Sequence, residues 1–365
     1  MNAKFSYKCN DCGKLIPAGG ISYLCPDCSA KQQPGQPPAG ILKVVYDPFF
    51  IRGKSFSALK ESRFLELLPL NSLQSLPNLR TGNTPLYEIE KLDGIPLEHS
   101  LLLKDDSQNP TFSFKDRASA IVSAFAWENG IEPLVAASTG NAGSSLAGMC
   151  AAQGQKAVIF VPASAPRAKL TQILMYGATL VPVDGNYDMA FDLSVEATRI
   201  FGWYNRNTAY NPLTIEGKKT VSLELFGQLN QRVPDRIFVP VGDGVIISGV
   251  YKGFEDLMAR GLIDRMPVIV AVQAEGSSNL IDNLGAGEFK ARPSSTIADS
   301  ISVDIPRNFS MAAAYLLKYQ GETIKVSDQA IINASSALAK NTGLFSEPAA
   351  AAAFAEAEYL RGGKK

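Results

Sequence analysis

The chain has 365 residues, which is enough for two domains with hydrophobic cores of their own. Lysine plus arginine and aspartate plus glutamate number 35 each, so the charge gives no indication of a nucleic-acid partner. There is one histidine, His99, which nearly excludes Ser–His catalysis and His-rich metal sites, and we expect it at the surface. No apolar run reaches the ~18 residues of a membrane span, and the N-terminus lacks a signal-peptide pattern. We therefore expect a cytoplasmic protein with no membrane or nucleic-acid partner.

Four of the five cysteines lie in the first 30 residues, as the pairs Cys9/Cys12 and Cys25/Cys28. Each C-x2-C pair can hold two thiolates on one tight turn, and two such turns make a tetrahedral four-thiolate site. The spacing is typical of a zinc ribbon and predicts a structural zinc. The alternative is a ribbon that no longer binds metal and is held by packing or a disulfide. The fifth cysteine, Cys150, falls on an apolar helix face and is expected in the core.

Residues 31–40 are rich in Pro, Gly and Gln and predict a linker, and residues 41–47 predict a strand. From Thr81 onward, apolar strands alternate with helices. The alternation begins with a strand expected at residues 100–106 and a helix that starts near Lys115, and a later helix is expected over residues 216–229. This alternation is typical of an α/β fold whose twisted, mostly parallel sheets are flanked by helices on both faces.

The expected organisation has four parts. They are a zinc-ribbon-like module at 1–30, a linker and N-terminal segment at 31–82, a smaller α/β domain at 83–182 and a larger α/β domain at 183–365.

Lys115 lies in the stretch NPTFSFKDR, at the start of a predicted helix. A lysine there is exposed to the positive end of the helix dipole, which lowers its pKa and favours it as an amine nucleophile. Taken alone, the same stretch also suits a solvated surface lysine in a turn.

Two small-residue loops each follow a predicted strand and precede a helix. In the first, Ser138, Thr139 and Gly140 precede Asn141, and backbone N–H groups there can bind a carboxylate. The second loop contains Gly242, Asp243, Gly244, Val245 and Ile246 and suits a phosphate. Each loop alone is also compatible with an ordinary strand-to-helix connection. A nucleophilic lysine together with anion sites is what a pyridoxal-phosphate enzyme of the tryptophan-synthase-β type requires.

Together these motifs resemble the threonine synthases, within the fold-type-II pyridoxal-phosphate family. The matching stretches are TGNTPL, NPTFSFKDR, STGN, EGKKT, PVGDGVIISGVYKGF and SEPAAA, in the order of the family, over most of residues 81–351. The resemblance implies that Lys115 bonds the cofactor covalently and that Asn141 hydrogen-bonds the cofactor's 3′-oxygen. It also implies that the backbone of residues 242–246 binds the cofactor phosphate.

The chain departs from the family pattern at several positions. Phe112 and Val245 stand where glycines are usual. Thr208, Ala209 and Thr214 stand where the family has Asn, Ser and Arg in contact with the substrate phosphate. A site without that arginine loses charge-assisted bonds, which Lys218 or Lys219 could replace only in part, as point charges. The family's Thr-Gly-x-Gly turn, which meets the pyridine nitrogen, has no match, so no partner for that nitrogen is assigned.

The resemblance implies a lyase that converts O-phosphohomoserine and water to threonine and phosphate, with Lys115 as the general base and acid. Its substrate would be a small amino acid, and we expect a homodimer. One alternative is another β- or γ-elimination or replacement enzyme, such as a phosphoserine-dependent sulfonate synthase or a hydroxyamino-acid dehydratase. A different class is a catalytically inactive paralogue that acts as an interaction protein, and the presence of Lys115 and Asn141 argues against it.

Overall fold

The computed structural model describes residues 3–47 and 54–359. It divides into two compact units, each made of several chain segments. The first unit is Met1–Cys25, Ile41–Thr84 and Asp106–Val221, and the second is Pro26–Gly40, Pro85–Asp105 and Ser222–Lys365. The first unit therefore holds Lys115 and the loop at 138–141, and the second holds the loop at 242–246.

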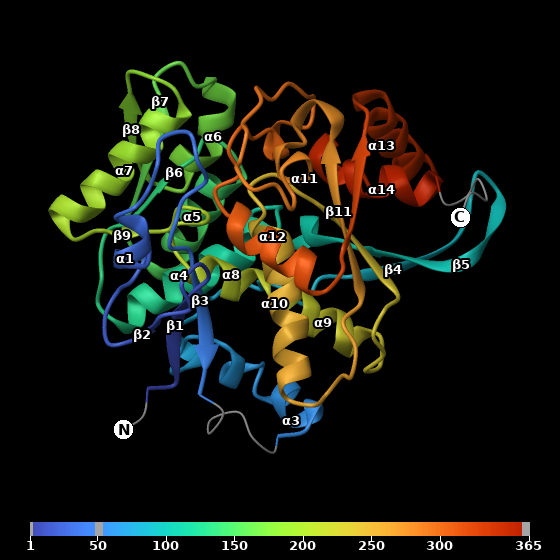
Figure 1. The fold of residues 1–365 in the computed structure, drawn as a ribbon, viewed down its shortest axis with the longest axis horizontal. Helices are drawn as coiled ribbons and strands as arrows, with labels where there is room; N and C mark the ends of the chain where they lie inside the picture. The colour runs from blue at the N-terminus through green and yellow to red at the C-terminus, as the bar shows by residue number, and fades with distance from the viewer. Residues whose placement is uncertain (1–2, 48–53, 360–365) are drawn as a thin grey trace. The chain divides into compact units, whose positions relative to one another are not determined.

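The first unit combines a parallel sheet, its helices and a small N-terminal sheet (Figure 1). Its strands are β1 (Phe5–Cys9), β2 (Leu15–Pro17), β3 (Leu42–Tyr46), β6 (Leu134–Ala137), β7 (Ala157–Pro162), β8 (Thr179–Val183) and β9 (Tyr204–Asn205). Its helices are α3 (Phe56–Glu61), α4 (Lys115–Glu128), α5 (Asn141–Gln153), α6 (Arg167–Met175), α7 (Tyr187–Phe201) and α8 (Leu213–Lys218), and α9 (Thr220–Gln228) continues into the second unit. Short 3-10 turns lie at Leu65–Leu67, Leu73–Ser75 and Asp106–Gln108.

The parallel sheet of the first unit has the strand order β8-β7-β6-β9. Alternate residues such as Val135 and Phe160 pack against α7, while Ile159 faces the side of α5. Both faces are thus buried, which explains why these strands are continuously apolar rather than alternating. The parallel, helix-covered sheet expected from the sequence is confirmed here.

Helix α4 is buried along nearly its whole length because most of its side chains are small. Helix α8 packs closely on it, and a Cβ atom at Gly217 would collide with the carbonyl oxygen of Arg117. Only glycine permits that approach. The glycine of the EGKKT stretch therefore has a packing role, beside the start of the helix that carries Lys115.

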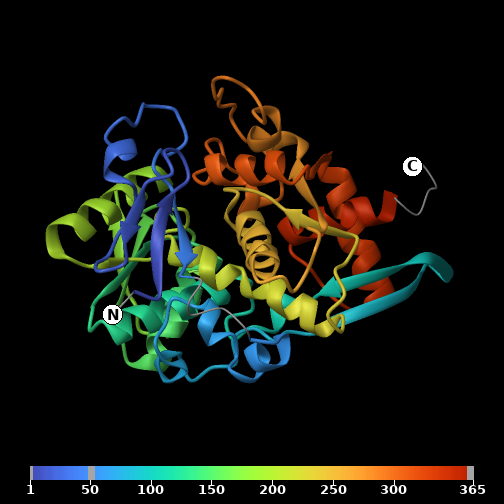
Figure 2. The same ribbon diagram turned by 60° about the horizontal axis from the view of Figure 1, so that its bottom comes forward.

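The N-terminal sheet has the order β2-β1-β3 and is antiparallel (Figure 2). Tyr46 at the end of β3 donates a hydrogen bond of 2.5 Å to Glu216 of α8. Glu216 also pairs with the buried Lys219, whose Nζ lies 4.3 Å from the centre of the Tyr46 ring. The N-terminal sheet is therefore joined to α8 by a buried charged group rather than by apolar contacts alone.

The second unit has a parallel sheet of order β10-β11-β12 and a separate hairpin. Its strands are β4 (Leu86–Leu92), β5 (Ile95–Lys104), β10 (Arg236–Pro240), β11 (Val268–Ala274) and β12 (Glu322–Val326). Its helices are α1 (Pro26–Ser29), α10 (Val245–Ala259), α11 (Asn279–Asp282), α12 (Phe309–Lys318), α13 (Asp328–Thr342) and α14 (Pro348–Tyr359), with 3-10 turns at Glu275–Ser277 and Asp299–Ile301.

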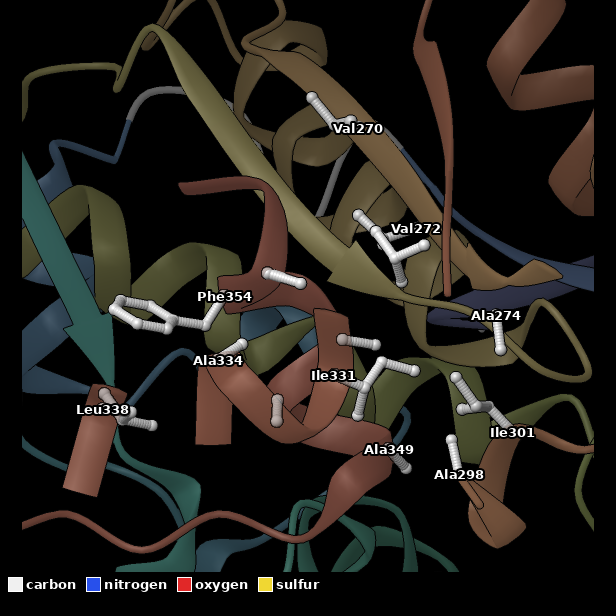
Figure 3. Packing of buried hydrophobic residues seen from close by; sticks show 14 of the residues in the cluster. Val270, Val272, Ala274, Ala298, Ile301, Ile331, Ala334, Leu338, Ala349 and Phe354 are labelled. Carbon is white, nitrogen blue, oxygen red and sulfur yellow. The ribbon is translucent and has the colours of Figure 1, made fainter. Parts of the chain in front are cut away.

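The core of the second unit forms where β11 meets the last two helices (Figure 3). Val270 and Val272 of β11 pack with Ile331 of α13 and Phe354 of α14. The alanine-rich sequence of α14 lets it lie close to the strands, and Ala351 and Ala352 are fully buried. This core supports the strand end from which the 242–246 loop departs.

Two elements differ from the sequence expectation. The sequence predicts a strand at residues 100–106 within the parallel alternation, but β5 pairs antiparallel with β4 as a two-stranded hairpin. The expected helix over 216–229 is two helices, α8 and α9, which meet at Lys219. The turn between them lets Thr220 accept a hydrogen bond from Arg117, 2.9 Å away. Along the described part of the chain, no helix combines the length and apolar character needed to cross a membrane.

Candidate functional site

Lys115 is the first residue of α4, and the two residues after it fix this helix turn in place. Asp116 is buried and accepts hydrogen bonds from the backbone N–H of Thr111 at 2.7 Å and from its hydroxyl at 2.5 Å. Arg117 is also buried and binds both carboxylate oxygens of Asp106, at 2.6 and 2.8 Å. We call these three residues, Asp106, Asp116 and Arg117, the α4 clamp.

Burial in the α4 clamp disfavours the charged form of the Asp116 carboxyl group. Burial raises the pKa of Asp116, and the hydrogen bonds from Thr111 counteract that effect. Lys115 itself is only half-buried, and its backbone N–H donates to the Ser113 hydroxyl at 3.3 Å. The clamp thus holds the helix start while the lysine side chain is kept out of the core.

Phe112 occupies the left-handed region of backbone conformation, with φ of +66°, and its side chain is 73% exposed. This conformation is unfavourable for a bulky residue and favours glycine, which is what the resembled family has there. The turn is closed by a hydrogen bond from the Phe112 N–H to the Asn109 carbonyl, 2.9 Å. The chain therefore keeps the family's turn while bearing the strain of an aromatic residue three positions before Lys115.

The loop at Ser138–Gly140 connects the carboxyl end of β6 to the N-terminus of α5. A Cβ atom at Gly140 would meet nothing within 4 Å, so the backbone there borders open space. A Cβ atom at Gly143 would lie 2.6 Å from the Ser138 carbonyl oxygen, so this first turn requires glycine. Asn141 is the first residue of α5 and is half-buried. The loop thus lies open at a helix N-terminus, and such a position can bind an anion.

The loop at Gly242–Ile246 has the same position in the second unit, between β10 and the 15-residue helix α10. Gly244 has a φ of +83°, and a Cβ atom there would lie 2.8 Å from the Cβ of Ala312. Val245 is already helical, which explains why valine is tolerated where the family has a second glycine. The glycine that the turn requires is therefore retained.

Asn308, which the sequence analysis did not identify, holds this second loop. Its side-chain N–H groups donate to the Gly244 carbonyl at 3.2 Å and to the Ser248 hydroxyl at 2.8 Å. Its backbone N–H donates to the Asp243 carbonyl at 2.9 Å, and the Arg307 N–H donates to the Asp243 carboxylate at 3.0 Å. Asn308 lies 64 residues after Gly244, and no local pattern links the two segments.

Asn207 has the corresponding role for the first loop and was also missed. Its side-chain oxygen accepts a hydrogen bond of 2.7 Å from the Ala137 N–H, directly before Ser138. Its amide group donates to the Ser194 hydroxyl at 2.7 Å. The sequence offers only a polar run, NRN, which begins at the last residue of β9, and nothing in that run indicates burial.

The positions that bind the substrate phosphate in the resembled family are occupied differently here. Thr208 is half-buried and accepts a hydrogen bond from Arg206 at 3.0 Å. Ala209 is buried at a φ of +63°. Thr214 is fully buried and donates to the Asn211 carbonyl at 2.8 Å, so its side chain has an internal function.

The other cations considered for an anion site have different surroundings. Lys104 is bound to Glu224 at 2.9 Å and to Gln228 at 3.0 Å. Arg167 is exposed at the start of α6, and Lys218 is almost fully buried in α8. None of these positions by itself identifies a phosphate ligand.

The four N-terminal cysteines come together as the spacing predicts. The sulfur atoms of Cys9, Cys12, Cys25 and Cys28 all lie within 4.8 Å of one another, and none is in a disulfide. Cys9 closes a tight turn in which it accepts from the Gly13 N–H at 3.0 Å. Four thiols at this separation can form a tetrahedral metal site.

Two further expectations about single residues are confirmed. Cys150 is buried in α5, and its surroundings raise the pKa of its thiol to about 12. His99 is exposed on β5. Neither residue belongs to the candidate site.

Each unit by itself holds residues whose chemistry can be stated. The first unit offers a half-buried amine at Lys115 and an open cradle at Gly140. The second offers a helix N-terminus behind a left-handed glycine, with the loop held by Asn308. An amine can bond an aldehyde covalently, and a helix N-terminus stabilises a phosphate.

Comparisons with known proteins identify the family of the chain. A family model described as pyridoxal-phosphate dependent enzyme matches residues 78–365. Threonine synthase from Methanocaldococcus jannaschii is 34% identical over 97% of this chain and 87% of its own length. Threonine synthase from Methanosarcina acetivorans is 32% identical over 96% and 85%. Among solved structures, maize serine racemase is similar with a TM-score of 0.64 and 25% identity, over 76% of this chain and 82% of that one.

The Asn308→Ala substitution tests how the second loop is held. It removes one donor to the Gly244 carbonyl, which still accepts from the Ser248 hydroxyl at 2.8 Å, and the donor to that hydroxyl. We therefore expect the free energy of unfolding to fall by about 0.5–1.5 kcal/mol. Amide hydrogen exchange at residues 245–248 should accelerate more than exchange in β11. Asn333→Ala, which removes an exposed hydrogen bond to Gln329, serves as the control. Equal effects of the two variants would contradict the role given to Asn308.

Proposed function

We propose that this chain, which belongs to the family of pyridoxal-phosphate dependent enzymes, is a threonine synthase that converts O-phosphohomoserine and water to threonine and phosphate. The observation that carries the proposal is the position of Lys115, a half-buried amine on a helix turn fixed by the α4 clamp, in the same unit as an open anion cradle. The threonine synthases of two archaea match nearly the whole chain, which supports this activity among those of the family.

The residues have separate roles in this proposal. Lys115 bonds the cofactor aldehyde, Asn141 hydrogen-bonds its 3′-oxygen, and the backbone of Gly242–Ile246 binds its phosphate at the N-terminus of α10. Ser138, Thr139 and Gly140 bind the α-carboxylate of the substrate through their N–H groups and the α5 dipole. When bound, the cofactor supplies an electron sink for a carbanion at the substrate.

Proton transfer falls to Lys115. Its Nζ, at the start of α4, would take a proton from the substrate and return it later in the reaction. Asp116 and Arg117 do not exchange protons in this scheme, because their side chains are engaged with Thr111 and Asp106. They orient the helix turn so that the Lys115 side chain reaches the same place in each step.

Product analysis tests this function. The purified protein loaded with cofactor should release phosphate and threonine from O-phosphohomoserine, and Lys115→Arg should abolish both products because the arginine cannot form the covalent bond. Lys340→Arg, an exposed lysine on α13, should leave the rates unchanged. Product from O-phosphoserine or from a hydroxyamino acid, with none from O-phosphohomoserine, would show that the chain is another lyase of the family.

We also propose that Cys9, Cys12, Cys25 and Cys28 bind one structural zinc in a ribbon-like module. The support is the mutual distance of the sulfur atoms, within 4.8 Å, and their origin in two C-x2-C turns. Four reduced thiols of this kind suit the reducing cytoplasm in which we place the protein. The expected homodimer stays a prediction.

Metal analysis of the purified protein should find about one zinc per chain. Cys12→Ser should lower zinc content and make residues 1–30 sensitive to proteolysis while leaving the cofactor on Lys115. Cys150→Ala is the control, because Cys150 is buried in α5 away from the cluster.

Removal of zinc by a chelator should expose four reactive thiols, and Cys150 should stay unreactive in the folded protein because burial raises its pKa to about 12. Metal-free protein with the same four thiols already reactive would refute the proposal.

A further inference from the structure

Arg206, directly after β9, is a fully buried guanidinium with an unused donor group. Its Nε donates to the Ser119 hydroxyl at 3.1 Å and its Nη1 to the Thr208 hydroxyl at 3.0 Å. Its Nη2 is buried and has no hydrogen-bond partner among the residues that the structure describes. Leaving a charged donor desolvated and unsatisfied is costly, so this arrangement points to a ligand that completes it.

The guanidinium stays charged at neutral pH. Burial lowers the pKa of Arg206 to about 10, and Tyr187 and the Asp116 carboxylate oppose that effect. Asp116 acts on Arg206 through its charge and not through a hydrogen bond to Nη2. The Asp116 carboxylate therefore offsets part of the Arg206 charge without a hydrogen bond, and Nη2 can still donate to a ligand.

Two contacts bring Arg206 to the candidate site within the first unit. Its backbone N–H donates to the Val135 carbonyl of β6 at 2.7 Å, so it lies beside the strand that leads into the Ser138 loop. Its partner Ser119 lies four residues after Lys115 on α4, which is one helical turn on the same face. Ligands of parallel α/β sheets bind at the carboxyl ends of the strands, which is where Arg206 follows β9.

Arg206 also accounts for the charge that is missing at position 214. Thr214 is buried and bonded to Asn211, so it cannot act as a phosphate ligand without leaving that bond. Thr208, which stands at the first of the phosphate-binding positions in the resembled family, is the residue that Arg206 holds. The arginine thus stands at position 206 instead of position 214, and it still contacts Thr208 of the family's phosphate-binding stretch.

We propose that Arg206, through Nη2, binds the phosphate group of the substrate and makes the enzyme selective for O-phosphorylated amino acids. The inference rests on the function proposed above and names the residue that selects its phosphorylated substrate. The neutral N–H groups of the Ser138 loop suit the singly charged α-carboxylate, whereas a guanidinium matches a phosphate in charge and geometry. Binding the phosphate satisfies the buried donor and holds the leaving group near Lys115.

Steady-state kinetics on the holoenzyme give the first test. Arg206→Met keeps the length of the side chain and removes its charge, so KM for O-phosphohomoserine should rise about tenfold to a hundredfold. Arg206→Lys should recover part of the loss as a point charge. Arg199→Met, on the exposed face of α7, is the matched control and should leave KM unchanged. An unaltered KM in Arg206→Met overturns the proposal.

Thermal unfolding with inorganic phosphate gives a second test that needs no turnover. The measurement uses the holoenzyme, in which the cofactor phosphate occupies the Gly242–Ile246 loop. Phosphate should raise the Tm of the unaltered holoenzyme and of Arg199→Met but not that of Arg206→Met. Without phosphate, Arg206→Met should unfold at the same or a higher temperature, because an unsatisfied buried charge has been removed. A purely structural arginine predicts the reverse, a lower Tm with the phosphate effect intact, and that result overturns the proposal. Loss of the phosphate effect in Lys218→Met alone would assign the site to Lys218 and also overturn it.

A second variant and a separate reading of the phosphate result cover the cases in which Arg206→Met does not fold or the proposed function fails. If Arg206→Met does not fold, Thr208→Val removes the acceptor that positions Nη1 and should weaken the phosphate effect while preserving volume. If the unaltered enzyme binds its cofactor but does not turn over O-phosphohomoserine, the function proposed above fails. The phosphate arm then still decides on Arg206, because it compares protein variants and not substrates.

Discussion

The arrangement depends first on the α4 clamp, in which two buried charged side chains directly follow a half-buried lysine. Arg117 binds Asp106 through two hydrogen bonds, and Asp116 binds the backbone and hydroxyl of Thr111. Buried charges are stable only with such partners, so the segment before α4 must adopt one conformation. The strained turn at Phe112 belongs to the same segment. The buried pairs of the clamp thus fix the backbone position from which the Lys115 side chain extends.

Much of the fold could be predicted because the strands are apolar throughout and the helices begin and end at recognisable residues. The parallel sheets around β6–β8 and β10–β11 follow from that pattern. The β4–β5 hairpin was not expected, because β4 alternates charged and apolar residues weakly and most of the hairpin is exposed. The division between α8 and α9 was also missed, since it is set by the contact of Gly217 with α4 and not by local propensity.

In the candidate site, residues within local sequence motifs could be predicted, whereas residues that act through contacts far along the chain could not. Lys115, the Ser138 loop, the Gly242 loop and the cysteine pairs each have a local pattern, and the structure places each at a helix start or a tight turn. Asn207, Asn308 and Arg206 were not identified, because their importance lies in contacts with residues far along the chain. A buried polar side chain is recognisable only once its burial and its partners are known. In this protein such residues hold the loops, and one of them carries the unsatisfied charge.

The central claim is that Lys115 is the residue that bonds the cofactor, and the most direct measurement is chemical mapping of that bond. Pyridoxal phosphate is added to the purified protein, the bond is fixed with borohydride, and the modified peptide is identified by mass spectrometry. The account predicts one modified lysine, Lys115, in the peptide that follows NPTFSF. Modification of Lys104, Lys218 or Lys219 in its place, or a protein that binds no cofactor, would contradict it.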